Sequence, residues 1–137
     1  MKPAEAAPIT EQPGERALRL ATAEVLGEIY TERARQLTGE GFTAERDDAL
    51  EPGALCAGAA AYAITASCEL YHPGCAPLTY GETELHGWGL GWEMWKPKTP
   101  RRDLIRAAAM IVAEISRLDR AAQQKETSQD VASADAL

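Results

Sequence analysis

The sequence contains few cysteines, no surplus of positive charge and no long hydrophobic run, and each absence argues against a class of protein. Three cysteines with no Cys-x-x-Cys pair predict reduced thiols rather than a disulfide framework. The apolar runs are shorter than the roughly 20 residues of a membrane span. The net charge of -7 disfavours duplex nucleic acid and anionic membranes as partners, because both require a positive surface.

Several familiar catalytic signatures are also missing. The chain has no P-loop, no Rossmann glycine pattern and no evident Ser–His–Asp or Cys–His arrangement. Residues 1–13 hold acids and prolines without an apolar centre, so we expect no signal peptide and a cytoplasmic protein. Any functional site must therefore be sought in residue patterns that are less common than these signatures.

What is present predicts one small all-α domain. We expect a flexible arm over 1–13, a helical domain over 14–122 and a flexible polar tail over 123–137. The expected architecture is a helical bundle of three main helices. A long Trp- and Gly-rich loop follows the second helix and has room for a short strand pair near residues 79–85.

Periodicity places the three helices near residues 14–39, 53–70 and 100–122. The first has an apolar stripe that includes Leu18, Val25, Ile29 and Leu37, widened by Leu26 and Tyr30. The second is Ala-rich and nearly uncharged, which is typical of a buried helix. The third helix repeats apolar residues at spacings of four and three, a pattern that suits either the core or a helix–helix dimer seam. These residues are Leu104, Ala108, Ile111, Ile115 and Leu118. Phe42, in the first connection, is expected to pack on the core.

Aromatic and basic residues gather before and at the start of the third helix. Aromatic faces can stack on a base, and arginine suits phosphate, so this group predicts a nucleotide site. Structural packing of the tryptophans and surface ion pairing of the arginines are the alternatives. The predicted ligand-binding residues are Trp88, Trp92, Trp95, Lys96, Arg101 and Arg102.

Carboxylates form two further groups. Glu24, Glu28 and Glu32 follow one another at four-residue spacing on the first helix, and Asp47 and Asp48 lie on the connection after it. Oxygen ligands of this kind suit Mg²⁺, so Glu28, Glu32, Asp47 and Asp48 are the predicted metal ligands. Solvated helix faces and helix capping are the alternatives. A zinc site from Cys68, His72, Cys75 and His86 can also be drawn, but its spacing is irregular.

The order of these segments resembles that of a group of small phage and prophage proteins. The likeness spans residues 24–120 and rests on Glu32-Arg33-Ala34-Arg35-Gln36, Glu40-Gly41-Phe42-Thr43, Glu45-Arg46-Asp47-Asp48, Trp95-Lys96-Pro97, Arg101-Arg102-Asp103-Leu104 and the segment 113–120. More distantly, the chain resembles MazG-like all-α nucleoside triphosphate pyrophosphohydrolases, which bind Mg²⁺ through Glu-x-x-Glu and Glu-x-x-Asp motifs. It departs from them in the second helix, which carries no Glu-x-x-Glu.

Three functions are compatible with these features. The first is a phage accessory protein in the bacterial host cytoplasm that binds a nucleotide or nucleotide-derived signal and sequesters it from host defence. The second, implied by the MazG-like resemblance, is an Mg²⁺-dependent pyrophosphohydrolase, so whether the chain is an enzyme stays open. The third is a protein–protein inhibitor of a host factor. Self-association through the second or third helix is also expected.

Overall fold

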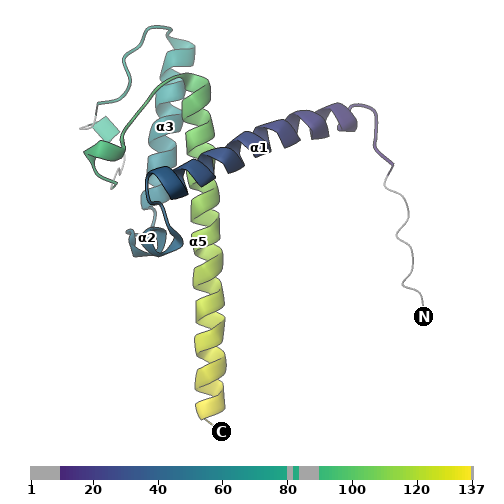
Figure 1. Ribbon diagram of the computed structural model, residues 1–137, viewed down its shortest axis with the longest axis vertical. Coiled ribbons are helices and arrows are strands. Elements are labelled where there is room, and N and C mark those ends of the chain that lie inside the picture. The colour runs from purple at the N-terminus through teal and green to yellow at the C-terminus, as the bar shows by residue number, and fades with distance from the viewer. Residues whose placement is uncertain (1–9, 80–81, 84–89, 137) are drawn as a thin grey trace.

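The computed structural model describes residues 10–79, 82–83 and 90–136, and this part of the chain is helical with no strand (Figure 1). The elements are α1 (Glu15–Gly39), α2 (Ala44–Ala49), α3 (Ala54–Tyr71), the 3-10 helix η1 (Trp92–Met94) and α5 (Pro100–Asp135). The predicted all-α bundle with three long helices is therefore confirmed. The strand pair expected near residues 79–85 lies largely outside the described residues, although Glu82 and Thr83 are helical.

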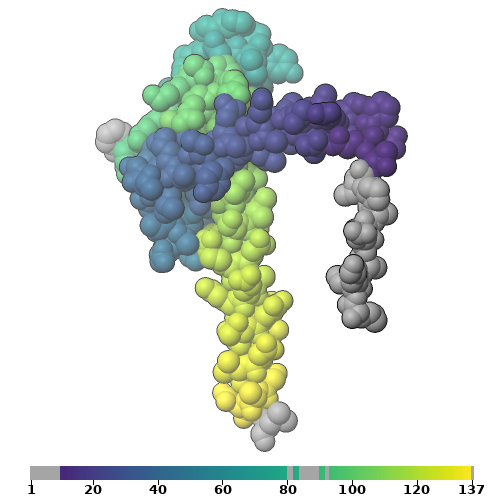
Figure 2. Space-filling model, turned by 45° about the vertical axis from the view of Figure 1, so that its right-hand side comes forward, coloured from purple at the N-terminus to yellow at the C-terminus, as the bar shows by residue number. Residues whose placement is uncertain are grey.

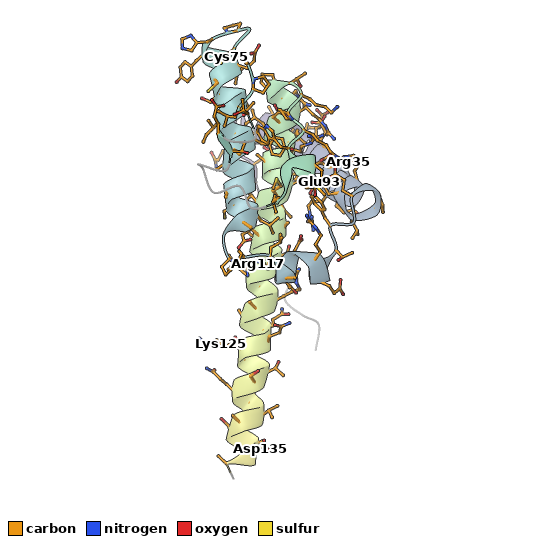
Figure 3. The ribbon with its side chains drawn as sticks, turned by 90° about the vertical axis from the view of Figure 1, so that its left-hand side faces the viewer. Arg35, Cys75, Glu93, Arg117, Lys125 and Asp135 are labelled. Atoms are coloured by element: carbon orange, nitrogen blue, oxygen red, sulfur yellow. The ribbon has the colours of Figure 1, made fainter. Side chains whose placement is uncertain are left out.

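Helix α5 differs most from expectation, because it continues to Asp135 where a flexible tail was predicted after residue 122. Residues 121–135 contain no glycine or proline, and seven of the fifteen are Ala or Gln, both of which are good helix formers. Lys125 and Asp135 project from the part of α5 that leaves the bundle (Figure 3). The polar composition thus predicted the exposure of this segment but not its helical conformation.

Local capping sets where the helices begin. The side chain of Thr99 accepts a hydrogen bond from the backbone N–H of Arg102 at 3.2 Å, and Pro100 occupies the first turn of α5. Thr43 caps α2 in the same way through the N–H of Arg46. Gly53 precedes α3 with a φ of 89°, a left-handed conformation that glycine adopts at no steric cost.

Helix α3 lies antiparallel beside the first half of α5, and the core sits between them (Figure 1). Small residues such as Ala59 and Ala107 let the two backbones approach closely, and the larger Leu55, Tyr62 and Met110 fill the remaining space. Phe42 is buried, as predicted, with 5% of its surface exposed. Among the described helices, α3 alone has the length and composition of a membrane span, yet core helices of soluble proteins share these properties.

The apolar stripe of α1 does not reach the core, contrary to expectation. The N-terminal half of α1 projects from the body (Figure 2), so Leu18 and Leu26 are 68% and 58% exposed, and Tyr30, further along the helix, is 76% exposed. The buried residues of α1 are instead polar, Glu32 and Gln36, where the helix crosses α5. The apolar repeat of α5 is also mostly exposed, and α3, predicted to be buried, is exposed along one flank.

Candidate functional site

Glu32 is the centre of a buried ionic network where α1 crosses α5. Its carboxylate accepts hydrogen bonds from Arg35 of the same helix at 2.7 and 2.8 Å and from Gln36 at 3.2 Å. Arg102 of α5 also donates to it, and Nε of Arg106 lies 3.7 Å from Oε1. The crossing is therefore fixed by one carboxylate that is shared among three guanidinium groups.

The protonation state of Glu32 follows from these neighbours. Burial acts to raise the pKa of the carboxyl, but the hydrogen bond and charge of Arg35 and the charge of Arg102 outweigh it, and the pKa is lowered. Glu32 is consequently ionised at neutral pH. A carboxylate held by three arginines is occupied within the chain, which makes it a poor direct ligand for a cation.

Arg106 extends the network towards the segment that carries Trp95. Its guanidinium donates to the backbone carbonyl of Lys96 and, at 3.3 Å, to the hydroxyl of Tyr62, and it lies 5.5 Å from the Tyr62 ring centroid. The Tyr62 hydroxyl in turn donates to the carbonyl of Met94 at 2.9 Å and accepts from the N–H of Lys96 at 3.1 Å. Buried polar groups thus attach the loop to α3 and α5.

The predicted ligand-binding residues are not all brought together. Trp95 packs on Tyr62 with ring centroids 4.7 Å apart, and its Nε1 donates to the carbonyl of Leu78 at 2.7 Å, so it organises the loop. Lys96 pairs with Glu40 at 3.1 Å. Trp88 and the side chain of Trp92 lie outside the described part of the structure.

Arg101 and Arg102 do share one site, an open hollow between α1 and α5. Arg101 donates to Glu28 across the hollow at 3.0 Å, and this hydrogen bond lowers the pKa of the Glu28 carboxyl. The hollow has a volume of about 510 Å³, whereas the pocket lined by Tyr62, Met94 and Arg106 measures about 10 Å³, well below the size of ligand sites. Its lining is Glu24, Gly27, Glu28, Thr31, Arg101, Arg102 and Ile105.

The four predicted metal ligands each face different arginines. Glu28 pairs with Arg101 and Glu32 with the network, while Asp48 accepts from Arg120 at 2.8 Å. In the described ranges, no three His, Cys, Asp or Glu side chains are arranged to hold a metal ion. Cys68, His72 and Cys75 of the suggested zinc site are therefore not arranged to hold a metal ion. Both of these cysteines are free thiols, and His86 lies outside the described ranges.

Asp47 is the least well satisfied of these carboxylates. It is 1% exposed, and neither oxygen has a hydrogen-bond partner among the described residues. Arg33 and Arg46 lie at 3.8 and 3.9 Å, beyond hydrogen-bond distance. Burial therefore prevails over these positive charges, and the pKa of the Asp47 carboxyl is raised.

Sequence analysis did not predict that Gln36, Asp103 and Glu114 are buried, although the three-residue spacing of Glu114 and Arg117 does predict their ion pair. Asp103 accepts from the N–H of Lys98 at 2.9 Å and so fixes the entry into α5, while Glu114 pairs with Arg117. A signal existed, because Asp103, Arg106 and Glu114 occupy the same side of α5 as core alanines. Charges in such a register indicate a buried ionic layer.

No family model, curated protein or solved structure matches this chain. The contacts within the fold are therefore the main basis for inferring a function.

Proposed function

We propose that this chain is a phage accessory protein of the bacterial cytoplasm that binds a nucleotide or nucleotide-derived signal by its phosphates. The observation that carries the proposal is that Arg101 and Arg102 line one open hollow between α1 and α5. The guanidinium fork matches phosphate oxygens in pairs. The side chain of Arg101 is 69% exposed, and surface ion pairs contribute little to stability, so an incoming phosphate can replace Glu28 as its partner.

A phage setting is supported by the order of sequence segments, which resembles that of small phage proteins. In that setting, sequestering a nucleotide signal would protect the phage from host defence. The aromatic stacking partner would come from Trp88 or Trp92, because Trp95 already packs on Tyr62.

A second candidate is an Mg²⁺-dependent nucleotide pyrophosphohydrolase, as the MazG-like resemblance implies. It is favoured by Glu24 and Glu28, which line the same hollow as the two arginines. Carboxylates beside arginines suit a cation bridged to phosphates, and the cation would polarise the phosphate and activate water. Glu32 would act indirectly here, through Arg102, which donates a hydrogen bond to it and lines the hollow.

Calorimetric titration with ATP and with a cyclic dinucleotide, each with and without Mg²⁺, tests the proposal. Arg101→Gln should weaken binding at least about tenfold, equivalent to about 1.4 kcal/mol. Arg120→Gln is the matched control, because Arg120 forms the same kind of ion pair with Asp48 and does not line the hollow. Equal affinity of the two variants would contradict the assignment of the site.

Chromatography of the recovered nucleotide separates the two candidates. Intact nucleotide supports the binding protein, and Mg²⁺-dependent release of monophosphate supports the hydrolase. If neither nucleotide binds, both are wrong, and the third interpretation, inhibition of a host protein, becomes the one to pursue.

A further inference from the structure

Helices α3 and α5 each carry an uncharged row of residues that the rest of the described chain leaves wholly or partly exposed. Both rows follow spacings of four, three, four and three, the pattern of a coiled-coil seam. The row of α3 is Cys56, Ala60, Ala63, Ser67 and Leu70, and the row of α5 is Leu104, Ala108, Ile111, Ile115 and Leu118. We call the surface formed by these two rows the α3–α5 face.

The two rows lie side by side on one face of the antiparallel helix pair. Near the start of α5 and the end of α3, Leu104 of α5 shares an apolar hollow with Ala63 and Leu70 of α3. Towards the other end of α3, Cys56 lies close enough to Arg117 of α5 to contribute to the pKa of its guanidinium. The rows therefore run together along α3, and each helix presents its apolar stripe in the same direction.

The sizes of the side chains indicate what covers this face. The central positions of the α3 row are small, as in Ala60 and Ala63, whereas those of the α5 row are large, as in Ile111 and Ile115. A two-fold axis parallel to the helices would place the α5 row of each copy on the α3 row of the other. Large residues would then meet small ones on both sides, which is the pairing that fills a helical core.

The exposed surface also favours a second copy of the chain as the partner that covers this face. A compact monomer of 14.8 kDa exposes about 7,000 Å², and this chain exposes 9692 Å². The projecting parts of α1 and α5 contribute to this surplus, and the α3–α5 face adds large apolar residues such as Ile115 and Leu118, 54% and 53% exposed. An obligate dimer buries about 1,000–2,500 Å² on each subunit, and the large apolar residues of the α3–α5 face are the part of the exposed surface suited to such burial.

We propose that a second copy of this chain covers the α3–α5 face and completes a two-fold symmetric, four-helix bundle. The arrangement makes every neighbouring pair of helices antiparallel, as in bundles with short connections. It also buries the exposed flank of α3, whose mean hydropathy of 1.2 is unusual for a helix that is only 44% buried. None of the residues that line the hollow containing Arg101 belongs to either row, so the dimer proposal does not rest on the proposed nucleotide site.

Sedimentation velocity of the full chain tests this proposal. The wild type should sediment as a dimer of the 14.8 kDa chain, and Ile115→Glu should weaken association at least about 30-fold, as loss of an interface hot spot does. Val131→Glu is the matched control, because Val131 is also on α5, is 56% exposed and lies off the row. It should leave the dimer intact.

A second variant guards against misfolding of the first. Ala60→Arg changes an exposed residue of the small row, so the helical content measured by circular dichroism should be kept while the dimer is lost. A wild type that stays monomeric, or two Glu variants that associate equally well, would overturn the proposal. So would flotation of a monomeric wild type with phosphatidylcholine vesicles, which would assign the face to a membrane.

Discussion

At the scale of single residues, the clearest prediction about stability concerns the ionic network around Glu32. Replacing Glu32 by Gln should lower the free energy of unfolding by about 3 kcal/mol, because it removes the carboxylate that pairs with the buried Arg106. Chemical denaturation measures this loss. Glu24→Gln, on the same helix but exposed, should change stability by less than about 0.5 kcal/mol. Similar losses in both variants would show that the network contributes little.

The stabilities of the wild type and of Glu32→Gln should also depend differently on pH. Since the folded pKa of Glu32 is lowered from its ordinary value of 4.5, its stabilising effect is present above pH 4.5 and is lost as the pH falls through the folded pKa. The stability difference between the wild type and Glu32→Gln should therefore shrink in acid. A difference that stays constant from pH 7 to pH 3 would contradict the lowered pKa.

Asp47 should show the opposite behaviour. Because its folded pKa is raised above 3.8, ionisation favours the unfolded chain, and the penalty grows as the pH rises from 3.8 through the folded pKa. Asp47→Asn should therefore be more stable than the wild type at pH 7, with an advantage that disappears below pH 3.8. Thermal unfolding at several pH values measures this, and Asp48→Asn, which loses a hydrogen-bonded ion pair with Arg120, should show no such gain.

At the scale of elements, the part of α5 beyond Arg120 is expected to unfold independently of the bundle. Its residues are exposed, and an isolated helical segment of this length is marginally stable in water. Ending the chain after Arg120 should lower the helical signal in circular dichroism but shift Tm by less than about 2 °C. A larger shift would show that the tail packs against another part of the molecule.

The helices themselves were largely predictable, because their signals are local. Thr99 followed by Pro100 indicates the start of α5, and Gly53 indicates the start of α3. The end of α5 was not predictable from composition, since a polar segment without glycine or proline is compatible with either a helix or a coil. Which face of α1 is buried was predicted wrongly, because hydrophobic periodicity identifies an apolar stripe without identifying its partner.

At the scale of the whole molecule, the proposed dimer couples folding to concentration. The Tm of the wild type should rise with protein concentration, because association stabilises only the folded state, whereas the Tm of Ile115→Glu should not. Differential scanning calorimetry over a range of concentrations measures both. A wild-type Tm that is independent of concentration would argue against a dimer that dissociates as it unfolds.

Local sequence patterns were enough to predict the all-α class and the three long helices. They also showed which arginines and carboxylates are available for phosphate or metal chemistry. Periodicity, capping residues and composition act over a few residues, so they can be read without a fold. Which of these arginines and carboxylates form ion pairs depends on the tertiary fold. The crossing of α1 and α5 brings Arg102 and Arg106 to Glu32, and the antiparallel pairing of α3 and α5 leaves one apolar face uncovered. Such pairings depend on distances between segments far apart in the chain, and no local pattern specifies those distances.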